Sequence, residues 1–167
     1  RKVQEDGYRY LAGFSYEDLP VWTYQERGVT VKRTLCMVQE ANTAAVLYEI
    51  ENRSERDCTL QAEPFLKFAP KEEALKEKKE FTYQRGSITD GKYTLYLSTD
   101  GNLRKRAAVW QTLAYPEDAK DGRPDHGLTG CCCRISKTIP AGSTGKLSIV
   151  FSMEPNPVSA EKLLAQA

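Results

Sequence analysis

Apolar and polar residues alternate with a period of two along most of this chain, and this pattern constrains the fold more than any other feature. Val46, Tyr48 and Ile50 alternate with Glu49 and Glu51. Successive side chains of a strand point to opposite faces, so the pattern indicates strands with one face on a core and one towards water. Similar runs occupy residues 29–37, 58–62, 93–97 and 147–153.

Short turn-forming pairs separate these runs, namely Arg27-Gly28, Asp90-Gly91 and Asp100-Gly101. Glycine tolerates the positive φ that tight hairpins need. Consecutive strands joined in this way form an antiparallel meander, and eight or more strands are too many for one flat sheet. We therefore predict an all-β fold, an antiparallel β-sandwich.

Two segments carry a helical pattern instead. Residues 70–79 are charged and contain Ala74 and Leu75, which predicts a short helical turn within a loop. Residues 158–167 follow Pro155 and Pro157 and predict a short C-terminal helix. The expected organisation is a sandwich domain over residues 1–157 and the start of a linker helix over residues 158–167.

The charge balance argues against two classes of partner. The chain has 24 Lys and Arg against 23 Asp and Glu, which gives a net charge of +1. Such a balance provides no field to hold nucleic acid or an anionic membrane. No apolar run approaches the roughly 20 residues that span a bilayer. We expect neither nucleic acid nor membrane as a partner.

The five cysteines include three consecutive ones, Cys131 to Cys133. Adjacent strand residues face opposite ways, so the three do not form a disulfide framework, and reduced cysteines favour a cytoplasmic location. Cys131 and Cys133 share a face with Ile135, which predicts small hydrophobic core residues. Structural zinc needs four converging ligands and the chain has one histidine, His126, so no metal is expected. A thiol nucleophile beside His126 is the alternative.

Two short motifs resemble functional sites but are better explained as turns. Residues 141–148 contain a Gly-Lys pair but lack the remaining residues of a phosphate-binding loop, which predicts a hairpin turn and no nucleotide cofactor. Asn52-Arg53-Ser54 fits a glycosylation acceptor, although a turn is the simpler interpretation. No two acidic residues are marked out as a catalytic pair.

Aromatic residues are concentrated in the first strands. Aromatic rings can stack on sugars, but in strands they more often form core and cross-strand pairs. We predict a core role, with sugar contact as the alternative. The residues are Tyr8, Tyr10, Phe14, Tyr16, Trp22 and Tyr24.

Several segments, in this order, resemble the N-terminal domain of bacterial glycogen debranching enzymes, the amylo-alpha-1,6-glucosidase family. The segments are residues 10–14, 19–24, 28–35, 37, 42–43, 46–48, 52, 115–123, 127 and 139–142. The resemblance implies a large β-sandwich, similar to the one that precedes the helical barrel in glucoamylases and disaccharide phosphorylases. It also implies that the catalytic acids belong to a C-terminal α/α-toroid domain, so this chain supplies no catalytic residue and is not itself an enzyme.

The implied role is to brace the catalytic domain and to contribute to the rim of its carbohydrate site. The long segment at residues 115–127 is the candidate rim loop, through Asp118, Asp121, Arg123 and Asp125. A loop held by its own turns and salt bridges is the alternative. The expected partners are the catalytic domain and glycogen or malto-oligosaccharide. An independent carbohydrate-binding module and a protein-interaction sandwich are the competing functions, and the resemblance allows either a hydrolase or a phosphorylase.

Overall fold

The computed structural model describes residues 7–70 and 73–155 and consists mostly of antiparallel strands. The predicted C-terminal helix at residues 158–167 lies outside the described residues. The elements are η1 (Gly7–Tyr10), β1 (Leu11–Tyr16), β2 (Pro20–Glu26), β3 (Val29–Met37), β4 (Thr43–Asn52), β5 (Cys58–Ala62), β6 (Thr82–Gln84), β7 (Ser87–Thr89), β8 (Thr94–Thr99), β9 (Asn102–Ala114), α1 (Pro116–Lys120), β10 (His126–Ile139) and β11 (Thr144–Ser152).

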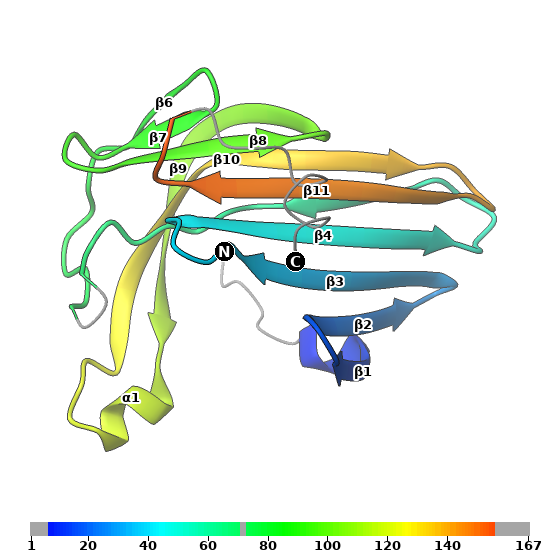
Figure 1. Ribbon diagram of the computed structural model, residues 1–167, viewed down its shortest axis with the longest axis horizontal. Coiled ribbons are helices and arrows are strands. Elements are labelled where there is room, and N and C mark those ends of the chain that lie inside the picture. The colour runs from blue at the N-terminus through cyan, green and yellow to red at the C-terminus, as the bar shows by residue number, and fades with distance from the viewer. Residues whose placement is uncertain (1–6, 71–72, 156–167) are drawn as a thin grey trace.

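The strands form two sheets of unequal size, which confirms the sandwich-like all-β prediction (Figure 1). The large sheet has the order β1-β2-β3-β4-β11-β8-β7-β6, and the small sheet has the order β5-β10-β9. Neighbouring strands in both sheets are antiparallel. The Arg27-Gly28 pair joins β2 to β3 with φ angles of 48° and 80°, as the hairpin prediction requires.

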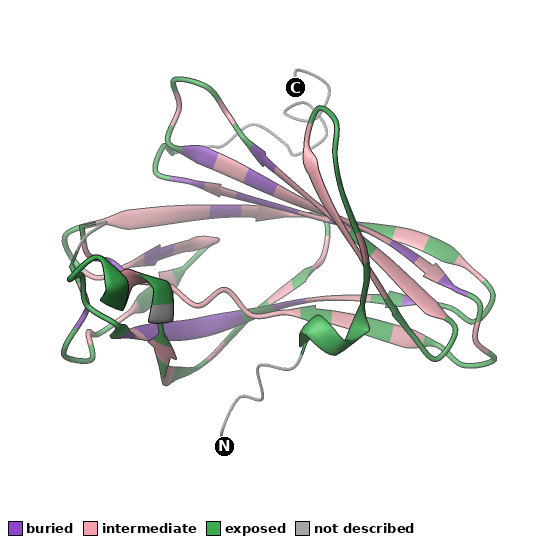
Figure 2. Ribbon diagram, turned by 90° about the horizontal axis from the view of Figure 1, so that it is seen from below, coloured by how far each residue is buried: buried purple, intermediate pink, exposed green. Residues whose placement is uncertain are grey.

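The main core fills the space between the small sheet and the middle of the large sheet. The predicted alternation places Leu60, Ile50, Leu147 and Ile149 there, and Ile135 of β10 packs against them from the small sheet. A second, smaller apolar cluster lies on the opposite face of the large sheet around Cys36, Ala45 and Val150. Figure 2 shows the buried residues in the strands and the exposed surface of α1.

Two parts of the predicted core are wrong. Met37, the last residue of β3, is 75% exposed, and Met153, which follows β11, is 41% exposed. The predicted helical turn at residues 70–79 is also wrong, since the described part of this segment has no helix. Instead, the backbone carbonyl of Leu75 accepts a hydrogen bond from the amide of Leu128 at 2.9 Å, and Leu75 is buried. Tertiary contact with β10 therefore overrides local helix propensity.

The cysteine triplet is buried, which confirms its interpretation as small hydrophobic residues, but its faces differ from the prediction. Cys132 and Cys133 both belong to the main core, while Cys131 lies outside that cluster near Glu63 and Arg134. The β9–β10 ladder is interrupted between Cys131 and Cys133, where residues 106–108 of β9 lie opposite Cys132. This bulge breaks the simple alternation of faces. Burial raises the pKa of the Cys133 thiol to about 12, so this thiol is a poor nucleophile.

Candidate functional site

The candidate rim loop lies at the tip of a long hairpin. Strands β9 and β10 extend beyond β5 and carry α1 at their far end (Figure 1). We call this hairpin, residues 102–139, the arm. Helix α1 was missed from the sequence, although Pro116 at its start and the acidic Glu117 and Asp118 in its first turn are typical helix-start signals.

The structure brings three of the four predicted loop residues together. Arg123 Nη2 lies 3.0 Å from Asp118 Oδ1 and 2.8 Å from Asp121 Oδ2, so one guanidinium joins two carboxylates. Asp125 lies apart from this group and pairs with His126 through Nδ1 at 2.5 Å. Asp118 is half-buried, whereas Asp121, Arg123, Asp125 and His126 are exposed. The loop is therefore held by internal ion pairs, and a charged or polar ligand would have to compete with them.

A hollow lies beside the base of this loop. It has a volume of about 490 Å³ and is lined by Leu75, Leu128, Thr112, Asp125 and His126, among others. Asp118 and Arg123 line a much smaller depression on the other side of Pro124, with a volume of about 20 Å³. The predicted loop residues therefore border two different depressions and do not converge on one site.

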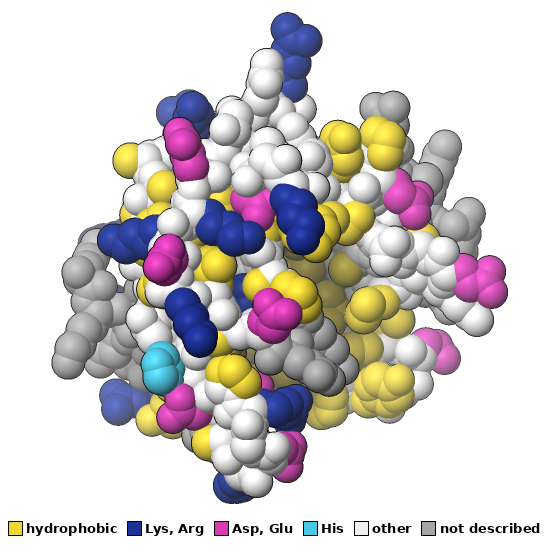
Figure 3. Space-filling model, turned by 90° about the vertical axis from the view of Figure 1, so that its left-hand side faces the viewer, with side chains coloured by type: hydrophobic (Ala, Val, Ile, Leu, Met, Phe, Trp, Pro, Cys, Tyr) yellow, Lys and Arg dark blue, Asp and Glu magenta, His cyan; other side chains and the backbone are white. Residues whose placement is uncertain are grey.

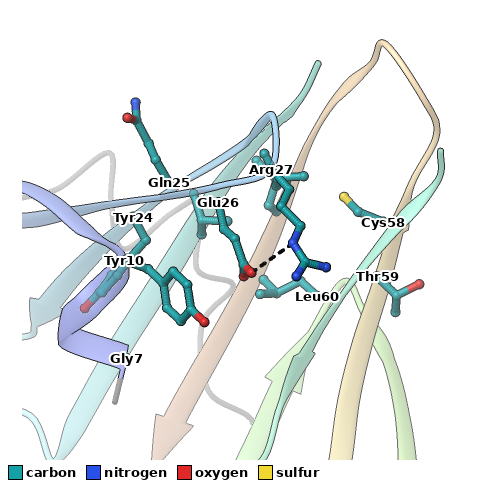
Figure 4. Close-up of a pocket in the computed structure, with 12 residues that line it drawn as sticks. Gly7, Tyr10, Tyr24, Gln25, Glu26, Arg27, Cys58, Thr59 and Leu60 are labelled. Carbon is teal, nitrogen blue, oxygen red and sulfur yellow. Dashed lines mark ion pairs between the residues drawn. The ribbon is translucent and has the colours of Figure 1, made fainter. Parts of the chain in front are cut away.

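A second candidate site lies between the two sheets, at the end where β2 meets β3. We call it the inter-sheet pocket, and its volume is about 430 Å³. Tyr10 and Glu26 project into it from one side, Tyr24 also lines it, and Leu60 and Cys58 line it from β5 (Figure 4). Sequence reasoning assigned Tyr10 and Tyr24 to the core and did not single out Glu26, because pairing across sheets cannot be read from alternation within one strand.

The aromatic residues of the first strands are more exposed than predicted. Tyr8 is 69%, Phe14 57% and Tyr16 68% exposed, and Tyr10 is also exposed. The core prediction is therefore wrong for Tyr8, Tyr10 and Tyr16, whereas Phe14 is exposed but forms a cross-strand pair with Trp22. Trp22 and Tyr24 are half-buried and do form cross-strand contacts, since Phe14 packs against Trp22 with ring centroids 5.3 Å apart.

Two acidic residues have lowered pKa values because they accept hydrogen bonds within the fold. Burial opposes ionisation of Asp90, but hydrogen bonds from Lys79 and from the amides of Tyr93 and Lys92 lower its pKa. The pKa of Asp100 is also lowered, because hydrogen bonds from Ser148 and Lys137 outweigh its burial. A general acid needs a raised pKa, so neither residue suits that role.

Across residues 7–70 and 73–155, no three His, Cys, Asp or Glu side chains are arranged to hold a metal ion. None of the helices that the structure describes has the length and hydropathy needed to cross a bilayer.

Comparison with known proteins gives one finding. The family described as the glycogen debranching enzyme N terminal matches residues 1–145. A comparison with curated proteins found no match.

Proposed function

Because this chain belongs to the glycogen debranching enzyme N-terminal family, we propose that it is a non-catalytic domain that braces the catalytic domain of an alpha-1,6-glucosidase. In this proposal the catalytic acids lie on an α/α-toroid domain of the same protein. The arm then lies beside the carbohydrate site and contributes its loop to the rim.

The observation that carries the proposal is the mismatch between the two sheets. Among the described residues, three strands oppose a sheet of eight. The inner face of β1 therefore keeps Leu11, Phe14 and Tyr16 exposed, at 43%, 57% and 68%. Large exposed apolar groups that lie together are typical of an interaction surface. Hydrophobic side chains also line a hollow on the side of the molecule shown in Figure 3.

The arm supports the same arrangement. It carries α1 and the ion-paired loop beyond the edge of β5, and none of the residues of β9 is buried. Ligand sites are common between domains, and a projecting hairpin reaches such a boundary more readily than a compact loop. Ion pairs of Arg123 with Asp118 and Asp121, and backbone hydrogen bonds from residues 121–123 to α1, link this loop to the helix.

Two exposed residues allow a test of the bracing role. Phe14→Ser with Tyr16→Ser should lower the Tm of the 167-residue chain only slightly, because both side chains are more than half exposed and only the contact of Phe14 with Trp22 is lost. In the longer protein that contains a catalytic domain, the same pair should lower the Tm of that domain. Lys32→Ser is the matched control, since Lys32 is exposed on the opposite face of the large sheet. Equal Tm values for the longer protein with and without the double substitution would refute bracing through this face.

The absence of catalysis is tested separately. The 167-residue chain should release no glucose from a branched α-glucan, since the proposal assigns the acid pair to another domain. Measurable glucose release by the purified chain would overturn the proposal.

A further inference from the structure

The inter-sheet pocket has an apolar floor that is continuous with the main core. Val29, Val31 and Ile50 line it, and all three also pack in or against the main core. Leu60 of β5 lies opposite them. Its volume of about 430 Å³ falls within the range of about 300–1,000 Å³ that is typical of small-molecule sites. A pocket whose floor is part of the core is formed before any ligand arrives.

The walls of the pocket include two tyrosines on different elements. Tyr10 comes from η1 and Tyr24 from β2, and Leu11 pairs with Tyr24 in the β1–β2 ladder, which brings the two elements together. Within the described part of the chain, no hydrogen bond engages the hydroxyl of Tyr10 or Tyr24. Each ring thus offers an apolar face and an available hydroxyl. The C–H face of a pyranose stacks on such a ring, and its hydroxyl groups can bond to the phenol.

The mouth of the pocket carries one acid and one base. Glu26 and Arg27 lie at the β2–β3 hairpin, with Arg27 Nε 3.5 Å from Glu26 Oε1 (Figure 4). Both residues are exposed, so this ion pair is weak and both groups remain accessible to a ligand. A carboxylate that accepts and a guanidinium that donates can together hold two neighbouring hydroxyl groups of a sugar.

The charges distinguish a sugar from other ligands. Glu26 and Arg27 cancel each other, so the mouth does not favour a phosphate or a cation. The apolar floor does not suit a polyanion either. A neutral ligand with apolar faces and many hydroxyl groups matches both the rings and the polar mouth. We propose that the inter-sheet pocket binds glucosyl units of an α-1,4-linked glucan chain. The choice of glucan rests on the proposed function, whereas the choice of a neutral sugar rests on the pocket.

The test follows alkylation of Cys58 in the 167-residue chain. Cys58 lines the pocket and is half-buried, whereas Cys36 and the cysteine triplet are buried. Saturating maltotriose should slow alkylation of Cys58 at least threefold, read by mass spectrometry of the cysteine-containing peptides. Tyr10→Ala should weaken maltotriose binding at least tenfold in a calorimetric titration, because it removes one wall. Tyr10→Phe should keep most of the affinity, since it keeps the ring.

The matched control is Tyr16→Ala. Tyr16 is an exposed tyrosine of β1 that does not line the pocket, so this variant should bind maltotriose as the parent does. Absence of any protection or heat at about 50 mM maltotriose, well above a millimolar Kd, would overturn the proposal. So would unchanged binding by Tyr10→Ala, equal binding of the β-1,4-linked cellotriose, or protection of Cys58 by an apolar peptide but not by maltotriose.

This outcome is separable from that of the proposed function. Failure to bind maltotriose would remove the sugar site and leave the Tm test of bracing unaffected. Loss of the bracing effect with maltotriose binding retained would instead favour an independent carbohydrate-binding module.

Discussion

The guanidinium carbon of Arg33 lies 4.4 Å from the centroid of the Trp22 ring, and the two residues are direct cross-strand partners in β2 and β3. The centroid of the Tyr24 ring, two residues further along β2, lies 5.8 Å from the same guanidinium carbon. Arg33 is the one charged residue on the otherwise apolar face of β3 in the predicted pattern. A cation–π contact explains how a charge is accommodated there, because the ring faces carry negative potential.

We expect Arg33→Met to lower the free energy of unfolding by about 1 kcal/mol, the size of a partly desolvated cation–π contact. Methionine keeps the apolar stem, so the loss reports on the charge. Urea unfolding followed by tryptophan fluorescence measures it. Lys32→Met, on the exposed opposite face, should change stability by less than about 0.5 kcal/mol. If Arg33→Met costs as much in a Trp22→Leu background as in the parent, the contact with Trp22 is not the cause.

The sheet layers could be predicted from the sequence because alternation depends only on local strand geometry. Cys58, Leu60 and Ala62 pack against the main core as their pattern predicts. The relative extent of the two sheets could not be predicted, and this relation decides whether residues such as Phe14 and Tyr16 are covered. Each strand shows which of its sides is apolar but not how far the opposite sheet reaches.

The candidate site was predictable only in part for a related reason. The acidic and basic residues of the rim loop are visible in the sequence, but their pairing around Arg123 depends on how α1 closes the loop. The inter-sheet pocket joins η1, β2 and β5, which are far apart in the sequence. No local periodicity reports on such a combination.

Asn52 connects three segments through one buried side chain, which is 1% exposed. Its Nδ2 donates to the carbonyls of Arg56, Ile139 and Pro140, and its Oδ1 accepts from Ser54. This amide is fully engaged, which confirms the turn interpretation over a glycosylation acceptor.

Asn52→Ala should therefore lower the free energy of unfolding by about 3 kcal/mol, since it leaves buried carbonyls without a donor. Asn52→Asp should cost at least as much at pH 7, because a carboxylate cannot donate to them. Asn102→Ala is the control, because Asn102 is exposed and should cost less than about 0.5 kcal/mol. Chemical denaturation gives all three values, and equal costs for Asn52→Ala and Asn102→Ala would contradict the role of Asn52.

Asp90 should make stability depend on pH. Its side chain is 1% exposed, and Lys79 Nζ lies 2.6 Å from its Oδ2. Burial works to raise its pKa, but the hydrogen bonds lower it overall. An acid whose pKa is lower in the folded state stabilises the fold above its unfolded pKa of about 3.9, and the contribution is lost as the pH falls through the folded value.

Asp90→Asn should accordingly lower the free energy of unfolding by about 2 kcal/mol at pH 7, because Lys79 loses its charged acceptor. The difference from the parent should shrink as the pH falls below about 4, where the unfolded parent binds a proton. Asp121→Asn, in an exposed ion pair, should change stability by less than about 0.5 kcal/mol. Urea unfolding between pH 7 and pH 2 provides the measurement. If the difference in free energy of unfolding between the parent and Asp90→Asn grows as the pH falls, the lowered pKa of Asp90 in the folded state is refuted.

Gly130 permits the aromatic packing in the outer half of the arm. It pairs with Trp110 in the β9–β10 ladder, and its amide and carbonyl both bond to Leu66. A Cβ at this position would lie 2.7 Å from Phe81 Cε2 and 3.0 Å from Trp110 Cη2. The two rings themselves pack with centroids 4.9 Å apart, so neither can move without losing the other.

We expect Gly130→Ala to lower the free energy of unfolding by about 2 kcal/mol, as overpacking a filled core does. Gly13→Ala is the matched control, because Gly13 also lies in a strand and has no atom within 4 Å of an added Cβ. Thermal unfolding gives the stability of both variants, and the emission of Trp110 should change only in Gly130→Ala. Equal stability of the two variants would show that the Phe81 and Trp110 rings adjust to the added methyl group, and that they do not hold this part of the arm in a fixed position.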